Sequence, residues 1–465
     1  MKRKKSLENL FLKSALTEEN PFISTKGIKQ WLKERNNAIS VNVKKIPFSE
    51  LKDWTLDEKK GVLKHQSGKF FTIEGINVQT NWGKVKEWDQ PIINQPEIGY
   101  LGIITKEFNG ILYFLLQAKV EPGNVNNVQL SPTLQATKSN YTQVHKGNKP
   151  RYLEYFQNAS RNNIILDQLQ SEQGARFLKK RNRNIILKID DEIEVHEDFI
   201  WLTLGQIKNL IQFDNLVNMD TRTVISGISF EYAVLPKFQF KNFELGMLIS
   251  ANEKTNVANA LDDIIKWITD LKCSYDLRVQ SKSIFNVRDW EVTPNEIRHK
   301  DKKFFKVIAA QVEISNREVT AWSQPLLEPV QEGIIAFITK KVNGIYHFLI
   351  QAKLESGNFD IIEMAPTVQC ITGSYKDDLA AVPFLEYVLN VDKNQIKFDT
   401  LQSEEGGRFY REQNRSLIIE ADEDFPSQIP ENYIWITLNQ LNYFIKFNNY
   451  LNIQARSLIS AIKFN

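Results

Sequence analysis

A dense run of polar side chains lies between residues 117 and 156, in the sequence QAKVEPGNVNNVQLSPTLQATKSNYTQVHKGNKPRYLEYF. His145 has an intrinsic pKa near neutrality and could serve as a general acid or base. The neighbouring cations could bind an anionic group through charge-assisted hydrogen bonds. The candidate catalytic residues are His145, Tyr141, Glu121, Lys119 and Glu154. The candidate substrate-binding residues of this run are Asn124, Gln129, Ser139, Asn140, Lys146, Lys149, Arg151 and Tyr152.

The start of this run occurs twice in the chain of 465 residues, as QAKVEPGN at 117–124 and QAKLESGN at 351–358, an offset of 234 residues. WDQP at 88–91 matches WSQP at 322–325, and LQSEQGARF at 169–177 matches LQSEEGGRF at 401–409. A period of a whole domain far exceeds the roughly 20–50 residues of solenoid repeats. We therefore predict two globular domains that arose by duplication, residues 1–235 and 236–465.

The two copies differ where the polar run is densest. TQVHKGNKPR in the first copy corresponds to KDDLAAVP in the second, which is shorter and largely acidic or apolar. Gln129 and Ser131 are replaced by Glu363 and Ala365. An anionic ligand prefers the cationic version. We therefore expect the working pocket in the N-terminal copy.

Each catalytic candidate also has a structural interpretation. His145 could be a surface histidine beside two lysines, and Tyr141 has the counterpart Tyr375. Lys119 and Glu121 occur in both copies, so they could hold the turn together or form an ion pair. Glu154 interrupts an apolar alternation, which is typical of a solvated face.

Arg176 and Trp82 complete the substrate-binding candidates. A planar guanidinium suits bidentate phosphate binding, but Arg176 could instead form a salt bridge with Glu172 or Glu404. Trp82 has no tryptophan counterpart in the other copy and could stack on a base, whereas Trp88 has a counterpart and is more simply a core residue.

Hairpins and helices must position these residues. Asn109-Gly110 and Asn343-Gly344 each lie between apolar runs and predict tight hairpins, because Asn-Gly readily adopts positive φ angles. The Gln-Ala-Lys segments then lie at the end of the second hairpin strand, where chemistry is common. Helical spacing of apolar residues predicts helices over 24–36 and 257–272.

Further along each copy, Trp201–Ile211 and Trp435–Phe444 show a helical pattern, and Thr223–Tyr232 and Ser457–Phe464 are interpreted as β-rich tails. Residues 233–252 are the expected junction between the copies. The predicted fold class is α+β, as two tandem modules of about 230 residues with mixed or antiparallel sheets flanked by helices.

Composition limits the partners. The chain is 42% apolar and 25% charged, with a net charge of +3 and both signs spread along it, so it has no long-range field for nucleic acid or membrane. The basic N-terminus is interrupted by Glu8, Asn9 and Lys13 and does not resemble a signal peptide. Only Cys273 and Cys370 are present, which fits a reducing cytoplasm and not a structural zinc site.

Familiar catalytic signatures are missing. The sequence contains no Walker phosphate loop, dinucleotide-binding glycine fingerprint, paired-His zinc motif or nucleophile elbow. We therefore expect no ATP, NAD or zinc cofactor.

The repeated motifs resemble those of the nucleoside-diphosphate-hexose 2,3-dehydratases of deoxysugar biosynthesis. The most specific are Gln-Ala-Lys-x-Glu-x-Gly-Asn, Ser-Pro-Thr-x-Gln-Ala-Thr at 131–137, Ser-Asn-Tyr at 139–141 and Leu-Gln-Ser-Glu-x-Gly-x-Arg-Phe. The resemblance covers nearly the whole chain. It implies a Nudix-like fold in duplicated modules, one working and one remnant pocket, and a homodimer. The Arg-Glu-x-x-Glu-Glu core of the Nudix box is absent from both copies, and with it the magnesium-binding carboxylates.

The implied substrate is a dTDP-linked 4-keto-6-deoxyhexose, and the implied reaction needs no cofactor, because the C4 ketone acidifies the C3 proton and takes up the charge as an enolate. The protein must supply a base for C3, stabilisation at the C4 oxygen and an acid for the departing C2 hydroxyl. The 3,4-diketo product is reactive, so we expect a ketoreductase to consume it. Two other functions stay open: a nucleotide-sugar binding module without turnover, and, less favoured, a magnesium-dependent Nudix hydrolase.

Overall fold

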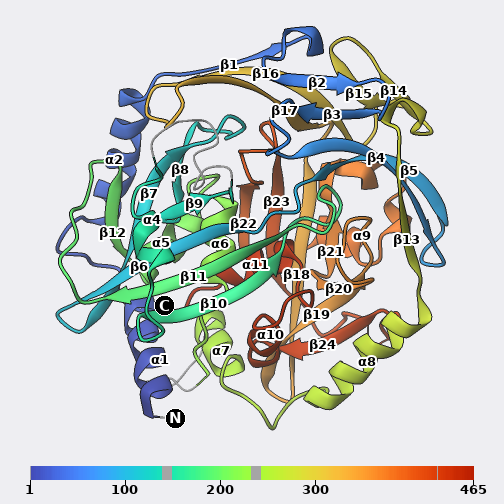
Figure 1. The fold of residues 1–465 in the computed structure, drawn as a ribbon. Helices are drawn as coiled ribbons and strands as arrows, with labels where there is room; N and C mark the ends of the chain where they lie inside the picture. The colour runs from blue at the N-terminus through green and yellow to red at the C-terminus, as the bar shows by residue number, and fades with distance from the viewer. Residues whose placement is uncertain (1, 139–148, 232–241, 427, 465) are drawn as a thin grey trace.

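The structure is a computed structural model that describes residues 2–138, 149–231, 242–426 and 428–464 (Figure 1). Its helices are α1 (Lys2–Ala15), α2 (Thr25–Ala38), α4 (Leu153–Gln157), α5 (Leu204–Ile211), α6 (Met219–Ile225), α7 (Phe243–Ser250), α8 (Leu261–Ser274), α9 (Leu385–Asn390), α10 (Leu438–Phe444) and α11 (Ile453–Ser460). Short 3₁₀ helices are η1 (Phe48–Glu50), η2 (Ile284–Asn286), η3 (Ile371–Asp377) and η4 (Leu379–Ala381).

Two seven-stranded mixed sheets form the bulk of the copies. The first has the order β10-β11-β6-β7-β12, with β8 on β7 and β9 on β6. The second has the order β20-β19-β18-β23-β22, with β21 on β18 and β24 on β19. Strands β6 and β11 are parallel, as are β18 and β23. The bounds are β6 (Gly99–Phe108), β7 (Ile111–Val120), β8 (Val128–Ser131), β9 (Leu134–Ala136), β10 (Ile164–Ser171), β11 (Arg181–Ile189), β12 (Phe199–Thr203), β18 (Gly333–Val342), β19 (Ile345–Lys353), β20 (Glu363–Ala365), β21 (Val368–Cys370), β22 (Ile396–Ser403), β23 (Gln413–Glu420) and β24 (Tyr433–Thr437).

Two five-stranded sheets are shared between the copies. One has the order β1-β16-β15-β14 with β17 on β16, and the other has the order β13-β4-β3-β2 with β5 on β4. Their strands are β1 (Val41–Ile46), β2 (Trp54–Asp57), β3 (Val62–His65), β4 (Thr72–Thr80), β5 (Glu87–Asn94), β13 (Leu277–Lys282), β14 (Trp290–Val292), β15 (Glu296–His299), β16 (Phe305–Ile314) and β17 (Ala321–Pro329).

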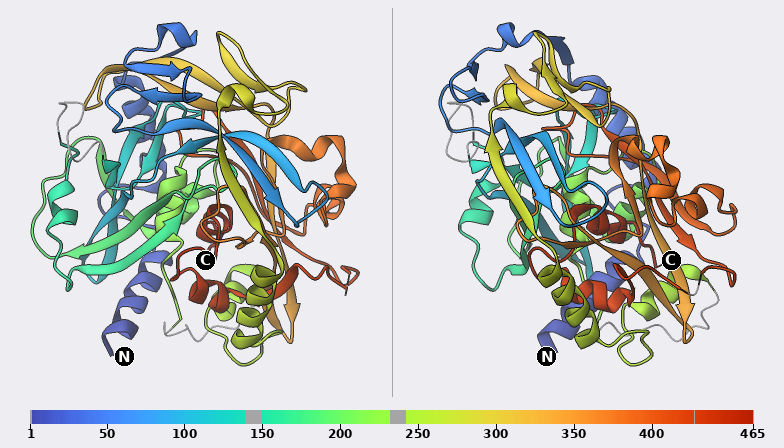
Figure 2. Two further views of the ribbon diagram at one scale, coloured as in Figure 1. Left: turned by 45° about the vertical axis from the view of Figure 1, so that its right-hand side comes forward. Right: turned by 90° about the vertical axis from the view of Figure 1, so that its right-hand side faces the viewer.

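The copies exchange their first strands. β1 of the N-terminal copy pairs with β16 of the C-terminal copy, from Val41 opposite Ile314, and β13 of the C-terminal copy pairs with β4 of the N-terminal copy, from Leu277 opposite Thr80. The sheet with β1 and β16 lies at one end of the molecule, and α1 and α8 lie toward the other (Figures 1 and 2). Neither sequence repeat therefore contains all the strands of its own sheets.

The Gly-Asn turns that follow β7 and β19 also connect the copies, because each turn hydrogen-bonds to the backbone of the other copy. Gly123 donates its N–H to the carbonyl of Gly406, and Gly357 donates to the carbonyl of Gly174, both at 2.7 Å. A Cβ at Gly123 would lie 1.7 Å from the carbonyl oxygen of Phe409. Glycine is required there because the two backbones approach so closely.

The predicted hairpins are confirmed. Asn109 and Gly110 have φ angles of 51° and 77°, and Asn343 and Gly344 have 53° and 78°. Gln117–Lys119 lies at the end of β7, as expected. Both predicted opening helices are confirmed as α2 and α8; the hydroxyl of Ser24 caps α2 by accepting from the N–H of Gly27.

The predicted β-rich tails are wrong. The first residues of each segment are the last residues of a buried helix, α6 or α11, and the structure describes no strand in the rest of either segment. The two helices contact each other between the two seven-stranded sheets (Figure 1). The side chains of Asn218 and Asn452 cap the helix starts by accepting from the backbone N–H groups of Thr221 and Ala455. Because every described residue of both helices is buried, they lack an amphipathic pattern and resemble buried strands in sequence.

The predicted helices over Trp201–Ile211 and Trp435–Phe444 begin too early. Trp201 and Trp435 lie in strands β12 and β24, and the helices begin three residues later. Thr203 and Thr437 end the strands and form capping boxes with a glutamine three residues on.

The α+β class with mixed and antiparallel sheets in two repeats is confirmed. The expected boundary at residue 235 falls in 232–241, outside the described residues. Helix α7, within the expected junction, packs on β19 through Phe243 and Tyr346, whose rings lie 5.1 Å apart. The Nudix-like fold stays a prediction.

Candidate functional site

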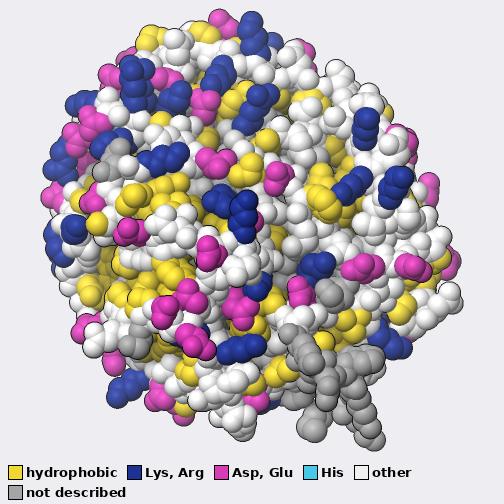
Figure 3. Space-filling view, turned by 180° about the vertical axis from the view of Figure 1, so that it is seen from behind, with side chains coloured by type: hydrophobic (Ala, Val, Ile, Leu, Met, Phe, Trp, Pro, Cys, Tyr) yellow, Lys and Arg dark blue, Asp and Glu magenta, His cyan; other side chains and the backbone are white. Residues whose placement is uncertain are grey.

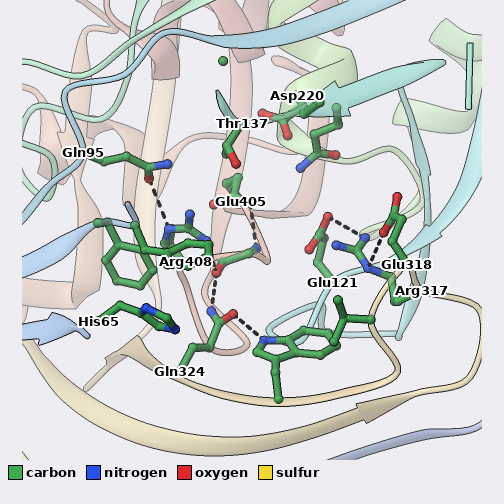
Figure 4. Close-up of a pocket in the computed structure, with 18 of the residues that line it drawn as sticks. His65, Gln95, Glu121, Thr137, Asp220, Arg317, Glu318, Gln324, Glu405 and Arg408 are labelled. Atoms are coloured by element: carbon green, nitrogen blue, oxygen red, sulfur yellow. Dashed lines mark hydrogen bonds and ion pairs between the residues drawn. The ribbon is translucent and has the colours of Figure 1, made fainter. Parts of the chain in front are cut away.

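A cavity of about 490 Å³ lies where the first seven-stranded sheet meets loops of the C-terminal copy (Figure 4). A volume of this size suits a small ligand. The N-terminal copy contributes Lys119, Glu121, Gln135, Thr137, Glu172, Lys180, Asn182 and Asp220, and the C-terminal copy contributes Arg317, Glu318, Trp322, Gln324, Glu405 and Arg408. Both copies are needed to form the cavity.

Lys119 and Glu121 stand where β7 ends. Lys119 Nζ lies 3.1 Å from Glu121 Oε1 and donates to the carbonyl of Gln135 at 3.2 Å, and Arg317 Nη1 lies 3.3 Å from the same Glu121 oxygen. Burial alone would raise the pKa of Glu121, but the charges of Arg317 and Lys119 outweigh it and lower the pKa. The ion pair between Lys119 and Glu121, one of the two interpretations from the sequence, is therefore present.

The segment LQSEEGGRF of the C-terminal copy brings Glu405 and Arg408 into the cavity (Figure 4). Glu405 Oε1 accepts a hydrogen bond from the N–H of Gly407 at 2.7 Å. The guanidinium of Arg408 lies 4.2 Å from the ring centroid of Phe71 and donates from Nε to Gln95 Oε1 at 3.3 Å. These contacts orient the planar guanidinium, which suits binding of an anion.

Three carboxyl groups of the cavity have raised pKa values. Burial raises the pKa of Glu405 to about 7, although Arg408 opposes the shift. Burial, followed by the charges of Glu405 and Glu172, raises the pKa of Asp220 well above its usual range. Burial also raises the pKa of Glu172. Clusters of this kind can hold and release protons near neutral pH.

Aromatic rings close one end of the cavity. Trp54, His65, Phe70 and Phe71 line it from the region of β2 to β4. The His65 ring lies 5.4 Å from Trp54 and 4.4 Å from Phe70 between centroids, and burial lowers the pKa of His65. A neutral aromatic surface beside Arg408 can accept a flat base next to an anion.

The matching place in the second copy has different charges. Arg176 lies there, 4.1 Å from the ring centroid of Phe305, where Arg408 lies against Phe71 in the first. Glu412 replaces Lys180 and Gln454 replaces Asp220. Burial lowers the pKa of Arg176, although the charges of Glu412 and Glu355 oppose it. Arg176 is 5% exposed and does not line the cavity described above.

Asn124 and Gln129 lie near the turn after β7 and do not line the cavity. Asn124 Nδ2 donates to the carbonyl of Asn127 at 2.6 Å. Gln129 is fully buried, and its Oε1 accepts from the hydroxyl of Ser403 at 3.0 Å. Both therefore fix the turn after β7 and its contact with the C-terminal copy.

Other predicted residues lie away from the cavity. The Tyr152 hydroxyl donates to the carbonyl of Glu194 at 2.8 Å, and the Trp82 ring packs 4.5 Å from that of Tyr275. Glu154 is exposed and lines a separate surface hollow. Lys149 and Arg151 are exposed too. The structure brings none of these five side chains to the lining of the cavity.

Five predicted residues fall outside the described part of the chain, namely Ser139, Asn140, Tyr141, His145 and Lys146. Their assigned roles stay predictions. Thr137 and Lys149 are described on either side of this segment, and Thr137 lines the cavity.

Sequence reasoning missed Lys180, Asp220, Arg317 and Glu405. Three of them differ in charge from the matching residue of the other copy, and that difference could have indicated them: Lys180 corresponds to Glu412, Asp220 to Gln454 and Glu405 to Gln173. No local motif indicates that a loop of one copy enters the cavity of the other.

Other features bear on ligands and partners. No group of three or more His, Cys, Asp and Glu side chains in the described part of the chain has an arrangement that could hold a metal ion. Of the helices within the described ranges, none is long and apolar enough to span a bilayer. On the face shown in Figure 3, acidic and basic side chains are intermixed.

Comparison with known proteins gives consistent results. The family model described as NDP-hexose 2,3-dehydratase matches twice, over residues 25–228 and 261–462. A protein of Saccharopolyspora spinosa named dTDP-4-dehydro-6-deoxy-alpha-D-glucopyranose 2,3-dehydratase is 43% identical over 97% of this chain and 94% of its own length. Proteins of the same name from Amycolatopsis orientalis and Streptomyces violaceoruber are each 40% identical, over 97% and 94% of this chain and 92% and 97% of their own lengths.

Proposed function

Because this chain belongs to the NDP-hexose 2,3-dehydratase family, we propose that it removes water from dTDP-4-keto-6-deoxyglucose to give the 3,4-diketo-2,6-dideoxy sugar. The observation that carries this proposal is the cavity itself, which combines Lys119, Arg317 and Arg408 with carboxyls of raised pKa. The cations suit a diphosphate and a developing enolate, and the carboxyls suit proton transfer.

The reaction is an elimination in which the substrate is its own electron sink. Removal of the C3 proton gives an enolate with its charge on the C4 oxygen. Loss of the C2 hydroxyl then forms the C2=C3 double bond, and the resulting enol tautomerises to the diketone. A positive charge close to the C4 oxygen lowers the barrier to the first step.

We place the reaction in the cavity of the N-terminal copy, as the sequence comparison favoured. Lys119 and Glu121 both line that cavity. Lys119 keeps its proposed catalytic role, and Glu121 is assigned to the ion pairs with Lys119 and Arg317. The roles of Ser139, Asn140, Tyr141, His145 and Lys146 in this reaction stay predictions. The homodimer, the downstream ketoreductase and the cytoplasmic location also stay predictions.

The direct test is incubation of the purified protein with dTDP-4-keto-6-deoxyglucose, followed by mass spectrometry. We expect a product lighter by one water, formed at the same rate with EDTA present. Tight dTDP binding without turnover would instead favour the binding module. Release of dTMP only when magnesium is added would favour a hydrolase.

We expect Arg408 to bind the diphosphate, the role that the sequence suggested for Arg176. Arg408→Lys should raise the Kd for dTDP about 10-fold, because a hydrogen bond to a charged group contributes about 1.5–3 kcal/mol and lysine cannot bind in a bidentate way. Titration calorimetry would measure the effect.

Arg176→Lys is the matched control, since Arg176 stacks on Phe305 as Arg408 stacks on Phe71. It should leave the Kd for this cavity nearly unchanged. A larger loss of dTDP affinity in Arg176→Lys than in Arg408→Lys would place the diphosphate in the second copy instead.

A further inference from the structure

The cavity and the matching place in the second copy differ most informatively at their carboxyl groups. Six carboxyl side chains line the cavity of the N-terminal copy, and four of them have an acidic or basic counterpart in the other copy: Asp53 matches Asp289, Glu121 matches Glu355, Glu172 matches Glu404 and Glu318 matches Lys84. Glu405 and Asp220 correspond instead to the amides Gln173 and Gln454. Glutamine has nearly the shape of glutamate but cannot take up or release a proton. At this position the first place therefore has a side chain that can transfer a proton, and the second does not.

The contacts of Glu405 explain why a carboxyl there matters. In the second copy, the Gln173 amide donates to Glu404 Oε2 at 3.0 Å, which satisfies that carboxylate. In the first copy, Glu405 and Glu172 take the two corresponding places, so a carboxyl replaces the side-chain amide that Gln173 supplies in the second copy. Glu172 is held by the amide of Asn182 at 2.9 Å, as Glu404 is held by Asn414 at 2.7 Å. Glu405 is therefore the residue at which this pair differs between the copies.

Asp220 is the second unusual group. It is 2% exposed and lines the cavity from the start of α6, yet it accepts no hydrogen bond from any residue that the structure describes. Its neighbours Glu405, Glu172 and Glu121 are all acidic, with Lys119 the nearby cation. A carboxyl in such surroundings keeps its proton, whereas Glu405 has the cation Arg408 beside it and can ionise near neutral pH.

Building on the proposed dehydratase function, we propose that Glu405 of the C-terminal copy removes the C3 proton and that Asp220 of the N-terminal copy protonates the departing C2 hydroxyl. The C3–H bond breaks and its proton passes to Glu405, while the electron pair forms the enolate. The C2–O bond then breaks, and the hydroxyl leaves as water with the proton of Asp220. Transfer of the Glu405 proton to Asp220 through solvent resets the pair, so the substrate loses one water in all.

This assignment fits the other carboxyls of the cavity. Glu121 is paired with both Lys119 and Arg317, and its lowered pKa makes it a weak base. Glu318 lies 3.7 Å from Arg317 and is likewise paired. The two copies thus share the paired carboxyl Glu121, whose counterpart is Glu355, and differ at the two carboxyls that we assign to proton transfer.

The test uses the full-length protein in D₂O with dTDP-4-keto-6-deoxyglucose, and it follows both water loss and deuterium entry at C3. Glu405→Gln should lower kcat by about 10²–10⁴-fold and abolish C3 exchange, with the Kd for dTDP nearly unchanged. Asp220→Asn should lose water formation to a similar degree and keep C3 exchange. In the wild type, kcat/KM should rise with pH through about 7, because Glu405 must be ionised to act as a base.

Gln173→Glu is the matched control in the other copy and should leave kcat unchanged. Melting temperatures of all variants check that they fold. If the wild type releases water and Glu405→Gln keeps kcat and C3 exchange within a few-fold, this inference is overturned and the dehydratase function stands. If the wild type shows neither water loss nor C3 exchange, both are overturned. Loss of C3 exchange in Asp220→Asn with its retention in Glu405→Gln would reverse the two roles and also overturn the assignment.

Discussion

Arg456→Met should lower the free energy of unfolding by about 3–5 kcal/mol, because it removes a buried cation that joins the two copies. Arg456 is 1% exposed; its Nε donates to Thr223 Oγ1 at 2.9 Å, and its Nη2 donates to the carbonyl of Ser171. Its Nη1 donates to the carbonyl of Leu451. Methionine fills much of the space but removes the guanidinium that donates to the buried carbonyls of Ser171 and Leu451, while Thr223 Oγ1 keeps the Asn184 amide at 3.3 Å. Urea unfolding would measure the change as a lower midpoint at an unchanged slope.

Arg183→Met is the control for this prediction. Arg183 forms a bidentate salt bridge with Asp167, 2.6 Å from Nη2 to Oδ2, but the two side chains are 33% and 38% exposed. A surface pair of this kind contributes about 0–1 kcal/mol. If both variants lost the same small amount of stability, the buried arginine would not join the copies in the way that its contacts indicate.

Local structure followed from the sequence where a short motif sets the backbone. Asn109-Gly110 predicted its hairpin correctly because its positive φ angles are accessible to few residue pairs. The same hairpin placed Lys119 and Glu121 at a strand end, and both line the cavity. Helices α6 and α11 were missed because they are buried on all sides, so no periodicity distinguishes them from strands.

The contacts between the copies could not be predicted from either copy alone. Pairing of β1 with β16 joins Val41 to Ile314, and no local pattern specifies a partner so distant in sequence. The same long-range exchange brings Arg317, Glu405 and Arg408 to a cavity based on the other copy's sheet. As a result, the sequence analysis assigned substrate binding to Arg176 of the repeated LQSEQGARF segment, whereas its counterpart Arg408 lines the cavity.

Lys119→Met should lower kcat by about 10²–10³-fold, the effect of removing one group that stabilises an oxyanion in the transition state. Lys119 is the cation that β7 holds in the cavity, and its Nζ is fixed by Glu121 at 3.1 Å and by the carbonyl of Gln135 at 3.2 Å. We expect it to stabilise the enolate charge on the C4 oxygen, so C3 exchange should slow together with water loss. Steady-state kinetics and deuterium exchange would measure both.

Lys353→Met separates this role from a structural one. Lys353 is the last residue of β19, and Lys119 is the residue before the last of β7. The Nζ of Lys353 donates to the carbonyl of Gln369 at 3.3 Å, the counterpart of the contact between Lys119 and Gln135. The two substitutions should therefore cost similar stability, while only Lys119→Met should lower kcat. Equal losses of kcat would mean that the lysines hold the turns together, and a raised Kd for dTDP with kcat retained would mean that Lys119 binds the diphosphate and not the C4 oxygen.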